Sequence, residues 1–496
     1  MRALSRALAG LALLAGALPA AQAQLQPCRI DGHRFEVMCG SVRRPLDPAR
    51  PDGPAIDVRY VVVPALARRK FDDPVFLIPG GPGQSASSVL SQVLPLFQRL
   101  NNRRDIVFVD QRGTGRSEPL DCEDPRHQSL ADQTDPDRQF RQLMACRDRL
   151  GARKNLGGVD GLKFFATPIA MQDLDAVRVQ LGAERINLVG ASYGTRAALD
   201  YLRQFPRHVR RVVLDGVAPP DMVLPASQSL DSQAVLDALL EACAREPGCA
   251  ADFPNLREDW AKLLSGLPRP VEVAHPLTGR PERLTLTREI VLATVRGALY
   301  APVLSAALPA ALHDAAAGRL EGLMGLGSSL FSGKAGAIAA GMHFSVVCAE
   351  DVPRLAGHAE GRGKDFGDGQ LQLYRRVCAE WPRSEVPPAF YTVPPSPAPV
   401  LLLSGGLDPA TPPRHAERVA TALGSNARHV VVDNAGHGLL SLGCLRDVWF
   451  RFIDAPDDAT ALRVDTSCAK GVPRPPALRP VRLPTEAKPR SASNTS

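Results

Sequence analysis

Short runs of consecutive apolar residues recur along the chain, and several of them end at a glycine-rich turn. They lie at residues 75–78, 106–109, 186–189, 212–214, 400–403 and 430–432. An uninterrupted apolar run of this length is typical of a strand that is buried on both faces of a parallel sheet. The earlier stretch 56–63 is expected to form an antiparallel strand at the edge of that sheet.

Helical patterns lie between some of these strands. Residues 167–182 begin with Thr167 as the expected N-cap and Pro168 at the first helical position, and Gly182 ends the pattern. A second helix is expected over residues 195–205. This alternation predicts a doubly wound, mostly parallel sheet with a functional site at the carboxyl ends of its strands.

The alternation stops after Asp215. Residues 220–390 are rich in Ala and Leu and are expected to be mostly helical, most clearly at 234–244 and 288–300. The simplest organisation is one α/β core interrupted by a helical cap that lies over the strand ends. The expected segments are the core at 24–219 and 391–470 and the cap insertion at 220–390.

The N-terminus has the pattern of a secretory signal peptide. Arg2 and Arg6 precede an apolar run at 7–18, and the small residues at 21–23 form a cleavage site that leaves Gln24 as the first mature residue. A membrane anchor is the alternative, but the run is shorter than the ~20 residues that span a bilayer. The pattern favours export to the periplasm or out of a bacterial cell, without stable membrane insertion after cleavage.

The cysteines fit export. There are ten, all beyond the signal peptide, and they fall in five local couples that we expect to be disulfides. No C-x-x-C motif and no histidine at ligand spacing accompanies them, so neither a metal nor another cofactor is expected. The expected pairs are Cys28 with Cys39, Cys122 with Cys146, Cys243 with Cys249, Cys348 with Cys378, and Cys444 with Cys468.

The net charge of +7 does not predict a nucleic-acid partner. The signal segment carries +2, and residues 471–496, a Pro-rich basic stretch expected to be a disordered tail, carry +4. The folded part, residues 24–470, therefore keeps only +1, which implies no basic face for phosphate.

A G-x-S-x-G motif at residues 190–194 follows one predicted strand and precedes a predicted helix. This is the setting of a nucleophile elbow, with Ser192 as the nucleophile. The turn is sharp, and a side chain at Gly190 or Gly194 would crowd the backbone around the serine.

The remaining parts of a serine-hydrolase site follow other strands. His437 is the expected base and Asp408 the carboxylate that orients it, with Asp215 as the rival acid. The backbone amides of Tyr193 and Gly81 are the expected oxyanion donors. Together with the strand pattern, these residues predict an α/β-hydrolase fold with an inserted cap.

The stretch at residues 110–117, which reads DQRGTGRS, follows another predicted strand. No Lys-Ser/Thr pair follows it, so it is not a phosphate-binding loop. A structural turn held by Asp110 and Arg112 is the expected role.

The chain resembles the proline iminopeptidase and tripeptidyl aminopeptidase family of α/β-hydrolases. The resemblance is carried by Gly-Gly-Pro-Gly at 80–83, Asp-Gln-Arg-Gly-Thr-Gly at 110–115, the serine motif and the Asp408 and His437 turns, which are similar to the C-terminal region of tripeptidyl aminopeptidases. Proline iminopeptidases carry His where this chain has Pro79, so the tripeptidyl branch fits better.

The resemblance implies a small peptide substrate with a free N-terminus, whose ammonium group would need acidic residues of the cap. Glu350, Asp351 and Glu380 are the candidates, and the alternative is that they are surface acids. The expected activity is that of a secreted or periplasmic serine exopeptidase.

Two alternatives stay open: a carboxylesterase with the same triad, and a non-catalytic binding protein. A dehalogenase or an epoxide hydrolase would need an aspartate as nucleophile, which Ser192 argues against.

Overall fold

Within residues 25–124, 128–328, 337–357 and 361–480, which the computed structural model describes, nine strands form one sheet. The predicted signal peptide lies outside these ranges. In chain order the strands are β1 (Gln26–Cys28), β2 (Val37–Pro45), β3 (Ala55–Val63), β4 (Val75–Ile78), β5 (Ile106–Val109), β6 (Ile186–Ala191), β7 (Val209–Asp215), β10 (Val400–Gly405) and β11 (Ala427–Val432).

The sheet order is β1-β2-β3-β5-β4-β6-β7-β10-β11. The six strands from β5 to β11 in this order are parallel to one another, as the apolar runs predict. Strands β1, β2 and β3 pair antiparallel, and β3 is also antiparallel to β5. The predicted antiparallel strand at 56–63 is confirmed as β3, but its position at the edge is wrong, because β2 pairs with β3 from Met38 to Pro45. Strand β2 carries Gly40, Arg43 and Arg44 and has no buried apolar run, so the pattern did not reveal it.

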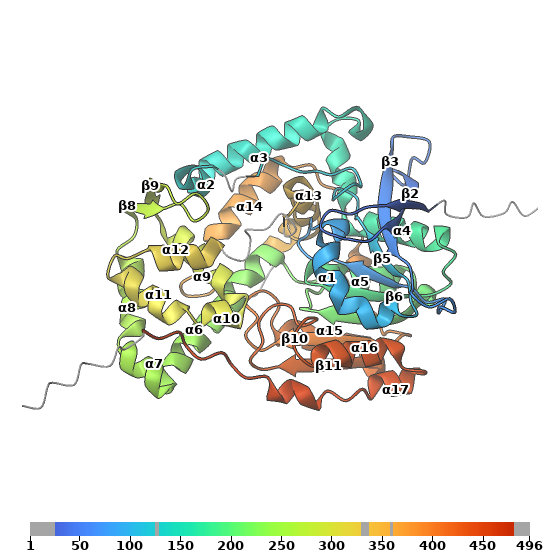
Figure 1. Ribbon diagram of the computed structural model, residues 1–496. Helices are drawn as coiled ribbons and strands as arrows, with labels where there is room; N and C mark the ends of the chain where they lie inside the picture. The colour runs from blue at the N-terminus through green and yellow to red at the C-terminus, as the bar shows by residue number, and fades with distance from the viewer. Residues whose placement is uncertain (1–24, 125–127, 329–336, 358–360, 481–496) are drawn as a thin grey trace, which may run out of the picture.

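Helices cover both faces of the sheet (Figure 1). In β4, Phe76 and Ile78 face one apolar core, and Val75 and Leu77 face the other. The first core is covered by α4 (Thr167–Gln180), α5 (Tyr193–Gln204) and α15 (Pro413–Leu423). The second is covered by α1 (Ala86–Asn101), α16 (Leu445–Asp454) and α17 (Asp458–Leu462).

The start of α4 differs from the prediction. The N-cap is Ala166, and Thr167 is already helical. The Thr167 amide donates to Glu350 Oε1 (2.7 Å), and its hydroxyl lies 2.6 Å from the Tyr193 hydroxyl. Both groups are occupied by side chains from distant parts of the chain, so Thr167 does not cap its own helix.

The inserted residues form a separate, mostly helical layer beside the sheet, with its own apolar core (Figure 1). Its helices are α6 (Leu224–Arg245), α7 (Pro247–Asp252), α8 (Leu256–Ser265), α9 (Arg288–Leu299), α10 (Pro302–Ser305), α11 (Leu308–Ala316) and α12 (Glu321–Ser328). Helices α13 (Ala340–Glu350) and α14 (Gly369–Glu380) follow them in the insertion, but their buried residues pack in the first core of the sheet.

Three elements of this cap layer were not predicted. A hairpin of β8 (Arg269–Ala274) and β9 (Pro281–Leu286) interrupts the helices. Helices α2 (Leu130–Thr134) and α3 (Pro136–Gly151) also lie along the cap, although they precede it in the chain (Figure 1). Leu130 packs in the apolar core of the cap.

Residues 471–480 are ordered along the cap. The Leu478 amide donates to the Ala306 carbonyl (2.8 Å), and Arg479 pairs with Asp252. The prediction of a disordered tail is therefore wrong for these ten residues, because backbone and ionic contacts with the cap fix them. Residues 481–496 lie outside the described ranges.

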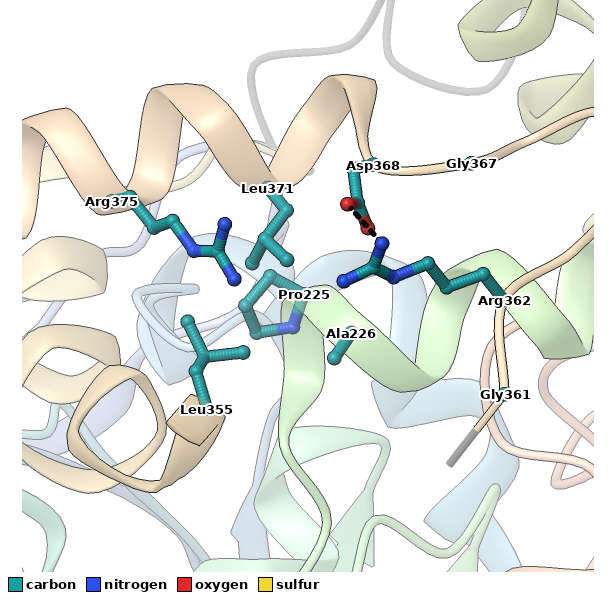
Figure 2. A pocket seen from close by; sticks show the side chains of 9 residues that line it. All are labelled: Pro225, Ala226, Leu355, Gly361, Arg362, Gly367, Asp368, Leu371 and Arg375. Carbon is teal, nitrogen blue, oxygen red and sulfur yellow. Dashed lines mark ion pairs between the residues drawn. The ribbon is translucent and has the colours of Figure 1, made fainter. Parts of the chain in front are cut away.

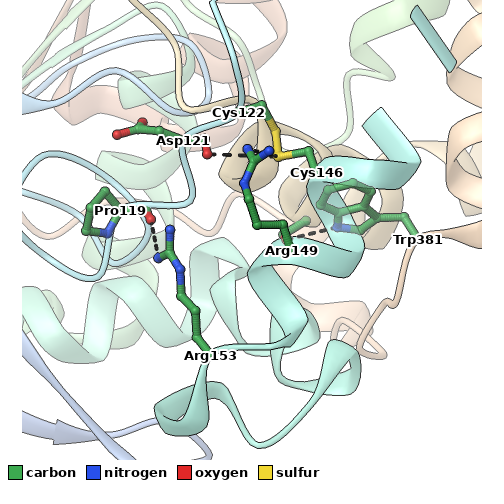
Figure 3. Close-up of a disulfide and its surroundings, with 8 residues drawn as sticks. Pro119, Asp121, Cys122, Cys146, Arg149, Arg153 and Trp381 are labelled. Atoms are coloured by element: carbon green, nitrogen blue, oxygen red, sulfur yellow. Dashed lines mark hydrogen bonds between the residues drawn. A yellow bond between two sulfur atoms is a disulfide. The ribbon is translucent and has the colours of Figure 1, made fainter. Parts of the chain in front are cut away.

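Five disulfides join the cysteines in the expected sequential pairs, and the described residues contain no free cysteine. Figure 3 shows the Cys122–Cys146 bond, which ties the segment before α2 to α3, with Arg153 donating to the Pro119 carbonyl nearby (2.7 Å). The Cys348–Cys378 bond joins α13 to α14.

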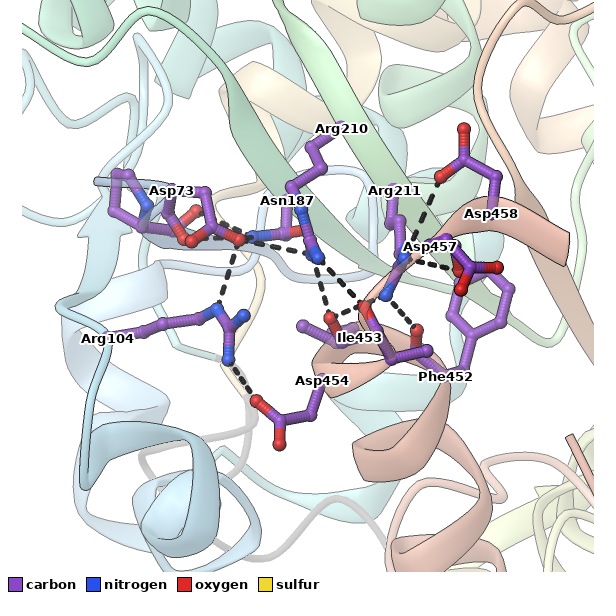
Figure 4. A network of polar contacts seen from close by, with 12 residues as sticks. Asp73, Arg104, Asn187, Arg210, Arg211, Phe452, Ile453, Asp454, Asp457 and Asp458 are labelled. Carbon is purple, nitrogen blue, oxygen red and sulfur yellow. Dashed lines mark hydrogen bonds and ion pairs between the residues drawn. The ribbon is translucent and has the colours of Figure 1, made fainter. Parts of the chain in front are cut away.

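A buried cation fixes the last helices on the sheet (Figure 4). Arg211 of β7, which has no exposed surface, donates to the carbonyls of Phe452 (2.6 Å) and Ile453 (2.8 Å) at the end of α16. Arg104 reaches Asp454 from the neighbouring layer (2.6 Å). The two Arg211 bonds satisfy backbone carbonyls that the end of a helix leaves without partners.

Candidate active site

Ser192 lies on a tight turn between β6 and α5, at the carboxyl end of the sheet. Its backbone has φ 55° and ψ −124°, a strained conformation for a residue with a side chain. The Ser192 amide donates to the Asp215 carbonyl (2.8 Å), and the Thr195 hydroxyl donates to the Ser192 carbonyl (2.6 Å). These two bonds hold the strained turn, which has the strand–turn–helix form of a nucleophile elbow.

The two glycines of the motif are required by close backbone approach, as predicted. A Cβ at Gly190 would lie 2.5 Å from the Gly194 carbonyl oxygen. A Cβ at Gly194 would lie 2.0 Å from the carbonyl oxygen of Ile78 at the end of β4. Real Cβ atoms do not approach oxygen this closely, so β4 and the serine turn pack tightly only without side chains here.

Asp408 and His437 form a hydrogen-bonded pair at the same end of the sheet. Asp408 follows β10, has no exposed surface, and its Oδ2 lies 2.8 Å from His437 Nδ1. The other oxygen accepts the amides of Ala410 (2.8 Å) and Thr411 (2.9 Å). The carboxylate is thus fixed from its own turn and aimed at the imidazole.

The charges of the pair stabilise each other. Burial raises the pKa of Asp408, but the charge and hydrogen bond of His437 outweigh burial and leave that pKa below its ordinary value. Burial lowers the pKa of His437, and the charge and hydrogen bond of Asp408 outweigh it, so that pKa lies above the ordinary histidine value.

Asp215, the rival acid, has a different role in the structure. Its carboxylate accepts the amides of Leu439 (2.8 Å) and Leu440 (2.9 Å) and makes no hydrogen bond to the imidazole. Burial raises the pKa of Asp215. Asp215 therefore holds the loop that follows His437, and Asp408 is the acid that contacts the ring.

The imidazole lies next to the serine turn. The Ser192 amide donates a hydrogen bond to the Asp215 carbonyl. A Cβ on the next residue in the chain, Gly216, would lie 3.0 Å from His437 Cε1. Gly216 has φ +66° and leaves room for the ring. Among the described residues the Ser192 hydroxyl makes no hydrogen bond, and catalytic hydrogen bonds are often long or unformed without substrate.

The loop that follows β4 lies against Ser192. A Cβ at Gly80 would lie 3.1 Å from Ser192 Cβ and 3.6 Å from its Oγ. The Gly80 amide is occupied by Gln84 Oε1 (3.2 Å). Tyr193 is the first residue of α5, where backbone amides have no acceptor within the helix. The loop that contains Gly81 and the first residue of α5 therefore both adjoin Ser192.

The predicted ammonium site is not formed by Glu350 and Asp351. Both side chains have no exposed surface, and both pair with Arg196, at 3.3 Å and 3.0 Å from its Nη1. Burial raises the pKa of Glu350 to about 7. A peptide ammonium group cannot reach carboxylates that are sealed in this way, so the prediction is wrong for these two residues.

Glu380, the third predicted acid, lies on the surface at the end of α14. Its side chain is 61% exposed, and its carboxylate lies 3.8 Å from Arg147. The Cys348–Cys378 disulfide is formed, but it does not bring Glu380 into the buried ion-pair cluster. Of the two readings of these acids, the surface role fits Glu380.

Several cap residues near the triad were not predicted. The Tyr300 ring packs edge-on against His437, with 5.2 Å between ring centres, and the His437 amide donates to the Tyr300 carbonyl (2.9 Å). His343 Nδ1 lies 3.2 Å from the Pro82 carbonyl and its Nε2 lies 2.9 Å from the Tyr374 hydroxyl. These residues sit in helical patterns like any other cap residue, so the sequence carried no local signal for them.

The turn at residues 110–117 is structural, as predicted. Asp110 is buried and accepts the hydroxyls of Ser85 (2.8 Å) and Ser87 (2.7 Å), which begin α1. Arg112 has no exposed surface and donates to both oxygens of Asp173 on α4 (2.7 Å and 3.0 Å). The turn therefore links the helices on the two faces of the sheet.

The cap also contains a pocket that none of the proposed triad residues lines. Figure 2 shows it between the first turn of α6, which carries Pro225, and α14, which carries Leu371. Arg362 and Asp368 form an ion pair across one side (2.8 Å). Over the described ranges, no cluster of three or more His, Cys, Asp or Glu side chains has the arrangement of a metal site.

Comparison with known proteins decides the family. The model of the family described as "alpha/beta hydrolase fold" matches residues 73–443. The chain belongs to this α/β-hydrolase family. Serine protease Hip1 of Mycobacterium tuberculosis is 26% identical over 442 residues, which cover 78% of this chain and 80% of that protein.

Two further relatives carry different names. Carboxylesterase B of Mycobacterium tuberculosis is 28% identical over 464 residues, 86% of each chain. Tripeptidyl aminopeptidase of Streptomyces lividans is 31% identical over 194 residues, 37% of this chain and 36% of that protein. With these relatives and the serine elbow, the α/β-hydrolase described here is a serine hydrolase.

The disulfides also bear on where the enzyme works. Five disulfides are typical of proteins that leave the reducing cytosol, so this hydrolase is exported. In the described part of the chain, no helix has both the length and the apolar character to span a bilayer.

Proposed function

We propose that this hydrolase cleaves peptide bonds near free N-termini by a triad of Ser192, His437 and Asp408. The single observation that carries the triad is the 2.8 Å bond between Asp408 Oδ2 and His437 Nδ1, on an imidazole packed beside the serine turn. The relatives named serine protease and tripeptidyl aminopeptidase support a peptidase.

In the proposed mechanism, His437 Nε2 takes the proton of the Ser192 hydroxyl as its oxygen attacks the substrate carbonyl. Asp408 keeps the other ring nitrogen protonated and stabilises the charged ring. The amides of Tyr193 and Gly81 donate to the oxyanion, and His437 returns the proton to the leaving amine. Water then attacks the acyl-enzyme, with His437 again taking the proton, and the acid product leaves as Ser192 is restored.

The proposed substrate is a small peptide that enters between the sheet and the cap, in the periplasm or outside the cell. The nearly neutral folded part offers no basis for a nucleic-acid partner. A carboxylesterase is the second candidate. It is favoured by the burial of Glu350 and Asp351, which removes the expected ammonium ligands, and by the relative named carboxylesterase B.

A matched substrate panel separates the two candidates. We expect Ala-Ala-Pro arylamide with a free N-terminus to be hydrolysed, and its N-acetyl form to be hydrolysed at least ~10-fold more slowly. This factor corresponds to the free energy of one hydrogen bond to a charged group, which acetylation removes. Turnover is followed by arylamine release, with p-nitrophenyl butyrate as the ester. Rapid ester turnover with no arylamide cleavage would establish the esterase and contradict the peptidase.

The pH dependence tests the role of the Asp408–His437 pair. The base must be neutral to accept a proton, and the pKa of His437 is raised. Activity should therefore rise with pH along an acid limb whose midpoint in kcat/KM lies above the ordinary histidine value of about 6.5. The Asp408→Asn variant lacks the negative charge that raises the pKa of His437, so the acid limb of its residual activity should have its midpoint at lower pH. An unchanged midpoint would contradict the assignment of Asp408.

A further inference from the structure

Arg296 reaches the proposed active site from the cap. It lies on α9, is half-buried, and donates from Nη2 to the Tyr300 hydroxyl (2.7 Å). The Tyr300 ring in turn packs on the ring of His437, and its carbonyl accepts the His437 amide. The side chain of Tyr300 therefore contacts both Arg296 and the proposed base, His437.

The charge of the same guanidinium also acts on Tyr374, which belongs to a second group of hydrogen-bonded side chains. Tyr374 of α14 bonds to His343, which bonds to the Pro82 carbonyl in the loop beside Ser192. Burial raises the pKa of Tyr374 to about 12, and the positive charge of Arg296 opposes this rise. The charge of Arg296 also lowers the pKa of His437, against the larger raising effect of Asp408. The charge of Arg296 thus acts on both His437 and Tyr374.

No carboxylate balances this cation. Among the described residues, Arg296 forms no ion pair, and its buried Nε has no hydrogen-bond partner. Arg112 and Arg196, which are fully buried, are both paired with carboxylates. A partly buried guanidinium without a counter-ion is costly, and a bound anion would remove that cost.

The buried carboxylates of the site already have partners. Asp408 holds His437 and Thr411, and Asp215 holds the amides of Leu439 and Leu440. Glu350 and Asp351 are sealed with Arg196. None of these carboxylates is therefore free to balance Arg296. In the proposed function the substrate binds next to His437, so a carboxylate of the substrate can supply the missing negative charge.

We propose that Arg296 binds a carboxylate of the substrate, so that the preferred substrates are short peptides with a free carboxylate close to the scissile bond. This inference rests on the proposed function and names its substrate class. A guanidinium offers a planar fork of N–H donors that matches a carboxylate, whereas an ammonium group would be repelled. The carboxylate can be the C-terminus of a short peptide or an acidic side chain.

Binding to an inactive protein tests this without relying on turnover. Calorimetry on the Ser192→Ala protein compares the tetrapeptide Ala-Ala-Pro-Ala as acid and as C-terminal amide, and Ala-Ala-Glu-Ala amide with Ala-Ala-Gln-Ala amide. We expect at least one carboxylate peptide to bind ~10-fold or more tightly than its neutral partner, as for a hydrogen bond to a charged group. The first pair reports the C-terminal source and the second the side-chain source.

The variants separate a binding role from a structural one. Adding Arg296→Gln should abolish the preference for the carboxylate peptide and leave neutral-peptide affinity within about 3-fold, because only the charged contact is lost. Arg296→Lys, which keeps the charge, should retain most of the preference. Arg283→Gln, at an exposed pair on the cap hairpin, is the matched control and should change neither affinity.

Three results would overturn the inference: equal affinity for acid and neutral peptides, no binding of either, or equal loss of both in Arg296→Gln. Its failure is distinguishable from failure of the proposed function, which is read on the wild-type protein. Wild-type cleavage of peptides without any carboxylate preference leaves the triad standing and removes only the role of Arg296.

Discussion

Replacing Ser192 by alanine is expected to lower kcat/KM on any substrate that the wild-type enzyme turns over by about 10⁴-fold or more, the usual loss when a serine nucleophile is removed. The alanine keeps the strained turn, since its bonds to Asp215 and Thr195 are made by the backbone of residue 192. The loss should therefore be chemical and not structural. Steady-state kinetics and an unchanged circular dichroism spectrum check this.

Ser227 offers a matched control for this variant. It is a fully buried serine on α6, whereas Ser192 is half-buried, and among the described residues its hydroxyl, like that of Ser192, makes no hydrogen bond. Ser227→Ala should keep kcat/KM close to that of the wild type. Retention of most activity in Ser192→Ala would show that another residue is the nucleophile.

Replacing Arg196 by methionine is expected to destabilise the fold by about 3–5 kcal/mol, the usual cost of leaving buried charges without their partner. Arg196 is the shared partner of Glu350 and Asp351, and all three side chains have no exposed surface. It also donates to the Met222 carbonyl (2.7 Å), at the start of the cap. The free energy of unfolding in urea, with the disulfides intact, measures the loss.

The exposed pair of Arg283 and Glu272 gives the comparison. Both side chains face solvent on the cap hairpin, so Arg283→Met should leave the unfolding midpoint unchanged within error. An Arg196→Met protein as stable as the wild type would mean that the buried cluster is not the ion network described here.

The sequence predicted the parts of the fold that are marked by burial on both faces. Val75–Ile78 and Ile106–Val109 are strands at the predicted residues, because a short, fully apolar run is typical of a strand buried on both faces. The serine turn was equally readable, since Gly190 and Gly194 are each required by a backbone atom of a neighbouring segment.

Features that depend on distant partners could not be read in this way. Glu350 and Asp351 have the appearance of surface acids, and only Arg196, far earlier in the chain, makes them a buried cluster. Strand β2 is half-polar and is defined by its pairing with β3. Arg296 sits in an ordinary helical pattern, and its place in the site depends on how Tyr300 meets His437.

Labelling with a neutral fluorophosphonate, followed by peptide mass mapping, tests the central claim most directly. The triad predicts one phosphonylated residue, Ser192, in the wild-type protein, and loss of that label at equal protein concentration when His437 is replaced by alanine. Absence of any label, a label on another serine, or undiminished labelling in His437→Ala would contradict the account.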